Sequence, residues 1–151
     1  MGMTVTLDRM VHTNAIHHEL GKTIGLQSCC ASCGNEDDLN PVDLLAMSVA
    51  SCMLILMATG AKQKGIDMTG TWANTAYDLN LKEYKVDSIT VTVYSPCSPS
   101  TAEREFLEKE GHRCPVYLAV KDTVAVNVAF AWGSAATPAA KKTEKSCCQC
   151  G

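Results

Sequence analysis

The feature that most constrains the fold of this chain is a run of eighteen residues, 44–61, that carries no charge. Asn40 and Pro41 supply a helix cap and a first turn before the run, and Gly65 supplies a helix terminator after it. The pattern therefore predicts one helix over residues 41–64, about 36 Å long at the rise of an α-helix. A helix that is apolar on every side is either buried at the centre of a fold or crosses a membrane.

The uncharged run fits a buried helix better than a membrane span. Eighteen residues is close to the shortest length that spans a bilayer, and aromatic anchors do not flank the run. It also contains polar and small residues, namely Ser48, Ser51, Cys52, Thr59 and Gly60. A chain of 151 residues, 46% hydrophobic and 19% charged, is long enough for one domain with a real core. We therefore expect strands of the same chain to cover the helix and a second subunit to cover what remains.

Around this helix the sequence alternates with the two-residue period of β-strands. Short strands are predicted within residues 3–27, an antiparallel hairpin over 68–80 and 86–95, and a last strand over 123–132. Ser100 and Glu103 form a capping box for a helix that runs to Gly111, and Pro115 opens a short helix directly after Cys114. The predicted class is α+β with an antiparallel sheet.

The net charge and the composition of the first thirty residues bear on the class of protein and on its expected compartment. The formal net charge is −3, which excludes the strongly basic surface of a nucleic-acid binder. The first thirty residues carry no apolar signal segment, so we expect a cytoplasmic protein with reduced thiols and without a membrane partner. We expect one domain over residues 1–135 and a mobile, cysteine-rich tail over residues 136–151.

Nine cysteines are the second unusual feature of the sequence. An odd number fits poorly with a closed disulfide framework, and cytosolic thiols are kept for reactivity or metal binding more often than for bridges. Three cysteines stand singly in patterned segments: Cys52, Cys97 and Cys114. The other six form two clusters, the first of Cys29, Cys30 and Cys33, and the second of Cys147, Cys148 and Cys150.

Two of the single cysteines lie where local structure affects their reactivity. Cys52 lies in the middle of the long helix, where it is either a small buried hydrophobe or a thiol that needs a nearby cation for activation. Cys114 precedes the short helix that begins at Pro115, where helix amides and the helix dipole favour a thiolate. His112 and Arg113 could add positive charge there. The alternative is that Cys114 merely caps the turn.

Taken together, two motifs resemble those of the OsmC/Ohr family of thiol-dependent hydroperoxide reductases. The first family motif has a proline, then an acid, and a cysteine eleven positions after the proline, which Pro41, Asp43 and Cys52 match. The second is Cys-Pro-Val before a short helix, which residues 114–116 match. The resemblance covers about residues 3–132, where the last predicted strand ends in an aromatic pair.

The resemblance implies an enzyme that reduces organic hydroperoxides to alcohols. Cys52 would be the peroxidatic nucleophile that becomes a sulfenic acid, and Cys114 would then form a disulfide with it. A dithiol or lipoyl-type reductant would restore both thiols, and the reaction requires no cofactor. The family fold implies an antiparallel sheet wrapped around the long central helix, in an intertwined homodimer whose sites lie at the subunit interface.

The sequence departs from the family at the group that activates the peroxidatic thiol. Family enzymes use an arginine from the N-terminal strands, held by a glutamate near the first motif. Here Val42 follows the proline and the acid is displaced to Asp43, which is typical of the broader OsmC-like branch. Arg9 is the only arginine of the N-terminal region and is therefore the candidate, with His17 or His18 as an alternative donor.

The two cysteine clusters lie outside both motifs. Cys30 and Cys33 have the spacing of half a zinc site or of a redox dithiol, and a structural zinc site needs four ligands. The clusters could hold a soft metal such as zinc, pass disulfides to Cys52 and Cys114, or have no specified role. This leaves a second hypothesis, an OsmC-like binding protein with little peroxidase activity that holds soft metal or small electrophiles through its clustered cysteines.

Overall fold

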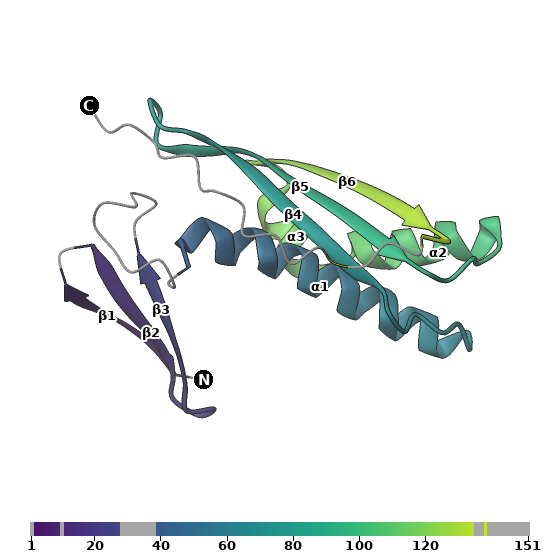
Figure 1. Ribbon diagram of the computed structural model, residues 1–151, viewed down its shortest axis with the longest axis horizontal. Coiled ribbons are helices and arrows are strands. Elements are labelled where there is room, and N and C mark those ends of the chain that lie inside the picture. The colour runs from purple at the N-terminus through teal and green to yellow at the C-terminus, as the bar shows by residue number, and fades with distance from the viewer. Residues whose placement is uncertain (1, 10, 28–38, 135–137, 139–151) are drawn as a thin grey trace. The chain divides into compact units, whose positions relative to one another are not determined.

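The computed structural model describes residues 2–9, 11–27, 39–134 and 138 (Figure 1). The chain divides into two compact units, the first containing the described residues up to Leu44 and the second those from Leu45 onward. Each unit contains a three-stranded sheet. The domain boundary predicted after residue 135 falls among residues outside the described ones, so it stays a prediction.

The first unit contains three antiparallel strands in the order β1-β2-β3. Their bounds are Met3–Arg9, His12–His17 and Lys22–Gln27. The strands predicted within residues 3–27 are therefore confirmed. Met3, Val5 and Leu7 alternate along β1 and so share one face, and each is more than three-fifths exposed in this chain. This apolar face has the composition of a surface that another element covers.

Helix α1, Pro41–Gln63, confirms the long helix to within one residue. Its start is fixed by a reciprocal cap, because the Val42 backbone N–H donates to Asn40 Oδ1 at 2.8 Å and the Asn40 N–H donates to Asp43 Oδ2 at 2.9 Å. By length and composition α1 could cross a membrane, but 39% of its apolar window is buried inside the chain. The other residues of that window are half-buried or exposed in this chain.

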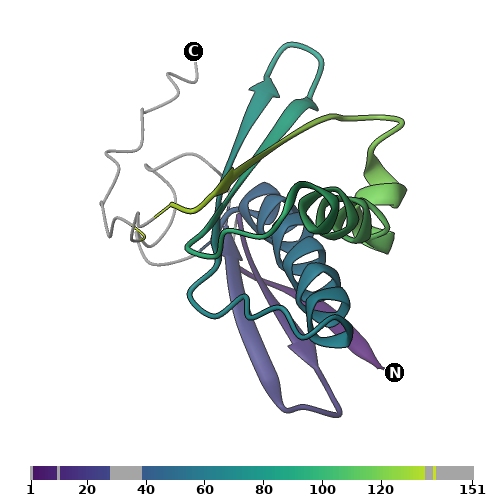
Figure 2. The ribbon, with the colours of Figure 1, turned by 90° about the vertical axis from the view of Figure 1, so that its right-hand side faces the viewer.

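The second unit contains a sheet in the order β4-β5-β6, with the helices on one face of it (Figure 2). The strands are β4, Trp72–Asn80, β5, Lys85–Ser95, and β6, Ala125–Trp132. Between β5 and β6 the chain forms α2, Thr101–His112, and α3, Pro115–Val120. The hairpin β4–β5 is antiparallel as predicted. The α+β class with antiparallel strands around a long helix is confirmed. β5 and β6 pair in parallel, which the sequence analysis did not anticipate, because the two helices carry the chain back across the sheet.

The core of the second unit lies between this sheet and α1. The inner side of α1 contributes Ala46, Val49, Ala50, Met53, Met57 and Ala61, and it packs with Ile89, Val91 and Val93 of β5, Leu107 of α2, and Cys114. Glycines allow a close approach of the two longer helices, since a Cβ on Gly111 would lie 3.1 Å from Met57 Cγ. The sequence pattern therefore predicted correctly that the uncharged run supplies the core.

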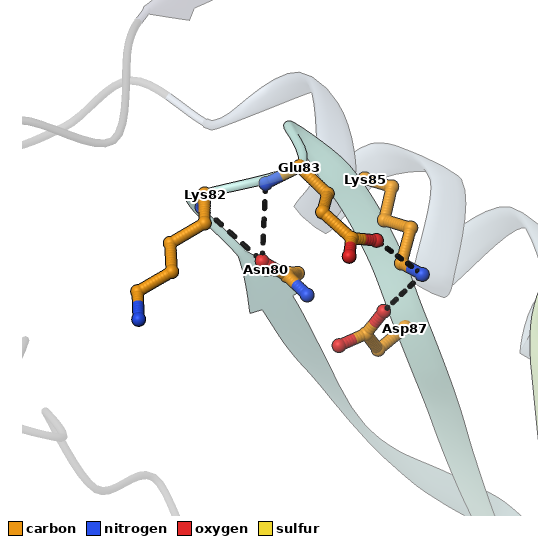
Figure 3. A network of polar contacts seen from close by, with 5 residues as sticks. All are labelled: Asn80, Lys82, Glu83, Lys85 and Asp87. Carbon is orange, nitrogen blue, oxygen red and sulfur yellow. Dashed lines mark hydrogen bonds and ion pairs between the residues drawn. The ribbon is translucent and has the colours of Figure 1, made fainter.

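The tip of the β4–β5 hairpin is closed by polar contacts (Figure 3). Asn80 Oδ1 accepts hydrogen bonds from the backbone N–H groups of Lys82 and Glu83, each at 3.1 Å. Lys85 Nζ lies 2.6 Å from the Glu83 carboxylate and 3.4 Å from that of Asp87, and these contacts raise the pKa of Lys85. The side chains are exposed, so the ion pairs add little stability. The Asn80 contacts instead define where the turn lies.

Candidate active site: a pair of thiols

Cys114 occupies the N-cap of α3, the position predicted from the proline that follows it. Its Sγ accepts a hydrogen bond from the Tyr117 backbone N–H at 3.2 Å. The side chain is fully buried and belongs to the core of the second unit. The N-cap position of α3 thus holds the Cys114 sulfur inside the core, where it faces α1 rather than solvent.

The structure brings Cys114 together with Cys52, although 62 positions separate them in the sequence. Cys114 Sγ lies 4.0 Å from the Val49 carbonyl oxygen, one helical turn before Cys52, and Cys52 is close enough to raise the pKa of Cys114. Cys52 is partly buried and packs against the core. Neither sulfur is part of a disulfide in the structure. The prediction that these two cysteines form a site is therefore supported by their geometry, while their catalytic roles are still predictions.

Burial raises the pKa of the Cys114 thiol above its ordinary value, and the hydrogen bond and negative charge of Cys52 act in the same direction. The backbone N–H groups of Tyr117 and Val116 lower that pKa, but they do not offset the other causes. The helix end had suggested a thiolate at Cys114. In the structure burial outweighs the helix amides, so Cys114 keeps its proton at neutral pH.

The two cations next to Cys114 in the sequence are directed elsewhere. Arg113 Nη1 pairs with the Glu110 carboxylate at 2.8 Å, and 67% of the arginine side chain is exposed. His112 Nδ1 donates to the Glu108 carbonyl oxygen at 2.7 Å. Neither side chain is among the groups that shift the pKa of Cys114. The expectation that they add positive charge at this sulfur is therefore wrong for the described residues.

An aromatic group that the sequence analysis missed lies beside α3. The His112 ring packs edge-on against Tyr117, with ring centroids 5.2 Å apart, and against Phe130 at 6.0 Å. Phe130 stacks on Trp132 at 6.2 Å, and the Trp132 indole N–H donates to Glu108 Oε1 at 2.8 Å. The alternation of β6 placed both aromatic residues on the core face. It could not show that the end of α2 meets them.

Three of the candidate residues, His17, His18 and Asp43, make their described contacts within the first unit. Arg9 ends β1, and its side chain lies outside the described residues. His18 Nε2 bonds to Thr4 Oγ1 at 2.7 Å, and His17 Nδ1 accepts a hydrogen bond from the Leu20 backbone N–H, three residues beyond the end of its strand. Asp43 caps α1, nine residues or roughly 13 Å along the helix before Cys52. The role of Arg9 and Asp43 in activation therefore stays a prediction.

The clustered cysteines all lie outside the described residues, so the proposed soft-metal site stays a prediction. Within the described part of the chain, no group of three or more His, Cys, Asp or Glu could hold a metal ion. The third single cysteine, Cys97, is separate from the thiol pair. Its Sγ lies 2.9 Å from Ser95 Oγ, which in turn lies 2.8 Å from Thr71 Oγ1.

A hollow of about 320 Å³ lies along α1 and β4, but it is not next to the thiol pair. Its lining consists of Met47, Ala50, Ser51, Leu54, Ile55, Ala73 and Thr75. Successive helix residues point 100° apart, so Cys52 and Leu54 lie on opposite flanks of Met53. The hollow and the thiols therefore use different sides of the same helix.

Residues 34–129 of this chain match the protein family described as "OsmC-like protein". The stretch contains both thiols and both helices that hold them. Among curated proteins, none is similar enough in sequence to match the chain. The family assignment therefore rests on the family match.

Three solved structures illustrate the likeness. A putative osmotic stress induced and detoxification response protein from Psychrobacter arcticus is 23% identical with a TM-score of 0.78, over 85% of this chain and 93% of that chain. An OsmC-like protein from Mycoplasma pneumoniae is 20% identical with a TM-score of 0.72, over 88% and 96%. The organic hydroperoxide resistance protein OhrB of Bacillus subtilis is 15% identical with a TM-score of 0.63, over 86% and 98%. At these identities the likeness shows the fold.

Proposed function

This chain belongs to the OsmC-like protein family, and on that premise we propose that it is a thiol peroxidase that reduces organic hydroperoxides to alcohols. The observation that carries the proposal is the contact between the Cys52 and Cys114 thiols in a largely apolar setting. Two thiols in contact can pass reversibly to a disulfide, which is the chemistry that such a reaction needs. Structures of similar fold include proteins named for organic hydroperoxide resistance, from Bacillus subtilis and Legionella pneumophila.

The reaction assigns one role to each sulfur. The Cys52 thiolate attacks the distal oxygen of the hydroperoxide, so an S–O bond forms, the O–O bond breaks and the alkoxide leaves as an alcohol after taking a proton. Cys114 then attacks the sulfenic sulfur, an S–S bond forms, and the hydroxide leaves as water. A dithiol or lipoyl-type reductant restores both thiols by exchange. A reducing compartment such as the cytoplasm would supply this reductant.

We also propose that two copies of the chain form the complete site. Ile55 on the outer side of α1 is 62% exposed, and Met47 on the same side is 40% exposed. Met3, Val5 and Leu7 on β1 are exposed as well. A second copy that covers these surfaces would bury the exposed side of α1 and enclose Cys52 in an apolar pocket. Arg9, from either copy, is the proposed cation that activates Cys52, with Asp43 as the acid of the first motif.

The test is peroxide consumption by the purified, reduced protein with cumene hydroperoxide and dihydrolipoamide. We expect Cys52→Ser to abolish turnover, because a serine hydroxyl does not form a sulfenic acid. Cys97→Ser is the matched control, since it removes one thiol that lies outside the pair, and it should retain turnover. Turnover that survives in Cys52→Ser would contradict the proposed function.

A further inference from the structure

The aromatic group beside α3 joins the helix that holds Cys114 to two other elements. The His112 ring, at the end of α2, packs edge-on against Tyr117 of α3, with ring centroids 5.2 Å apart and an angle of 82° between the planes. Phe130 of β6 lies on the same histidine ring at 6.0 Å. The Tyr117 backbone N–H donates to Cys114 Sγ at 3.2 Å. The residue whose ring meets His112 is therefore also the one that holds the sulfur.

The His112 ring is itself held by Glu108, one helical turn earlier on α2. Its Nδ1 donates to the Glu108 backbone carbonyl oxygen at 2.7 Å, which limits rotation of the ring. The Glu108 carboxylate accepts from the Trp132 indole N–H at 2.8 Å, and Trp132 stacks on Phe130 with the two planes 9° apart. These contacts form a continuous series from β6 through α2 to α3.

Helix α3 depends on such contacts because it is short. A six-residue helix is not stable by itself, and all six residues of α3 are described and none of them is buried. Cys114 at its N-cap is, by contrast, fully buried. The place of the Cys114 sulfur is therefore set by what holds α3 against the rest of the second unit.

We propose that His112 is a positioning residue: its ring packs against Tyr117 and thereby holds the Cys114 sulfur where it can form a disulfide with Cys52. This inference deepens the peroxidase function proposed above and rests on it for the identity of the disulfide. His112 acts by contact and not by charge, because it is not among the groups that shift the pKa of Cys114.

The expected consequence is a higher effective concentration of the Cys114 thiol at Cys52. A sulfur that is held in one place loses little conformational freedom when the S–S bond forms, whereas a sulfur on a loose turn loses more. Removal of the ring contact should therefore shift the equilibrium from the disulfide toward the two thiols. One aromatic pair corresponds to a factor of about five in such an equilibrium.

The experiment equilibrates the full-length protein with mixtures of glutathione and glutathione disulfide. Two protein thiols lose two electrons and two protons to become the disulfide, and one glutathione disulfide is reduced to two glutathione molecules. After an acid quench, peptide mass spectrometry gives the ratio of linked to free Cys52 and Cys114 among the nine cysteines. We expect His112→Ala to lower the equilibrium constant about fivefold. His112→Phe keeps a ring between Tyr117 and Phe130 and should stay within about twofold of the parent protein.

Tyr94→Ala is the matched control, because it removes a different ring contact of the second unit. Tyr94 stacks on Trp72 at 4.4 Å, and this pair joins β5 to β4. The substitution should lower the free energy of unfolding in urea and leave the equilibrium constant in place. An unchanged constant in His112→Ala, or an equal fall in Tyr94→Ala, would overturn the proposal. A higher constant in His112→Ala would also overturn it, since the ring would then hold the sulfur away from Cys52.

A second variant covers the case in which His112→Ala does not fold, which circular dichroism shows. Tyr117→Leu removes the other ring of the pair but keeps the backbone N–H that bonds to Cys114, and it should lower the constant by a similar factor. An unchanged constant in Tyr117→Leu would equally overturn the proposal. Where both variants fold, the double variant should fall no further than either single one, because the two rings act through one contact.

Failure of this inference and failure of the proposed function give different results. If the constant falls as expected but the protein does not consume cumene hydroperoxide, His112 positions Cys114 and the peroxidase function is wrong. If hydroperoxide turnover depends on Cys52 and the constant does not change in His112→Ala, the function stands and the positioning role is wrong. A parent protein that forms no disulfide between Cys52 and Cys114 in any of the mixtures would overturn both.

Discussion

The two sides of α1 are both uncharged over residues 44–61 but differ in what covers them. The inner side, centred on Met53 and Met57, is fully buried against β5 and α2. The outer side exposes Met47 and Ile55. The comparison shows that an uncharged run predicts burial without saying which molecule provides it. One side is covered by the chain itself, and the other is the side that the proposed second copy would cover.

Cys52 lies on a flank between these two sides. The proposed function depends on this cysteine, so the environment on each side matters for its reactivity. It packs against the inner core and contacts Cys114, yet it is not fully buried within one chain. The inner side therefore positions Cys114, the proposed resolving thiol. The outer side, once covered, would form the rest of the substrate pocket. Changes on each side should separate these two contributions.

The largest effect should come from the inner side, tested by shortening a methionine. Met57 is fully buried, so Met57→Ala leaves a cavity and should lower the free energy of unfolding by about 2–5 kcal/mol in urea denaturation. Met47→Ala makes the same chemical change on the outer side and is the matched control. Its smaller effect should depend on protein concentration, whereas the effect of Met57→Ala should not. Equal effects at every concentration would remove the distinction between the two sides.

The next effect should come from a charge on the outer side. Ile55→Lys would bury a cation in the proposed interface, so the dimer dissociation constant should rise at least about tenfold, equivalent to about 1.4 kcal/mol. Sedimentation velocity over a dilution series measures it. Thr90→Lys adds the same charge on the exposed face of β5, away from α1, and should leave association unchanged. A protein that is monomeric before the substitution would show that something other than a second copy covers this side.

The sequence predicted most of this fold because the informative patterns were local. The cap at Asn40, the box at Ser100 and the N-cap at Cys114 each depend on residues within four positions, and all three are present. The parallel pairing of β5 with β6 was missed because strand direction depends on where two intervening helices lead the chain. Alternation within one strand carries no such information.

The site was predictable in its members but not in its electrostatics. Cys52 and Cys114 were identified through motifs at two separate places, and the structure brings them into contact. The ionisation of Cys114 was misjudged because a helix N-terminus is visible in a sequence while depth of burial is not. The Val49 carbonyl and the Tyr117 N–H were missed for a similar reason, since backbone groups have no residue signature.

A third, smaller effect tests how closely the inner side packs. A methyl group at Gly111 would lie 3.1 Å from Met57 Cγ and 3.2 Å from its Sδ, and Met57 is fully buried. Gly111→Ala should therefore cost about 1–2 kcal/mol of unfolding free energy, since overpacking outweighs the gain in helix propensity. Gly60→Ala is the matched comparison, because the nearest atom there is Glu110 Cγ, on a longer and partly exposed side chain that can move. A stabilised Gly111→Ala protein would show that this helix contact is looser than the distances indicate.

The smallest effect should come from the cap of α2, which supports the inner side without touching the outer one. Ser100 Oγ caps the helix and Glu103 bonds back to it, so Ser100→Ala should cost about 1 kcal/mol of unfolding free energy. The hydrogen bonds from Ser100 lower the pKa of Glu103 in the folded protein. Their contribution is therefore present above the unfolded pKa of the glutamate and is lost as the pH falls through the lower, folded value. The difference between the two proteins should shrink over that acidic range in urea denaturation, and the dimer dissociation constant at neutral pH should not change. A difference that persists at low pH would assign the effect to the serine cap alone, and a changed dissociation constant would show that the two sides of α1 are coupled through α2.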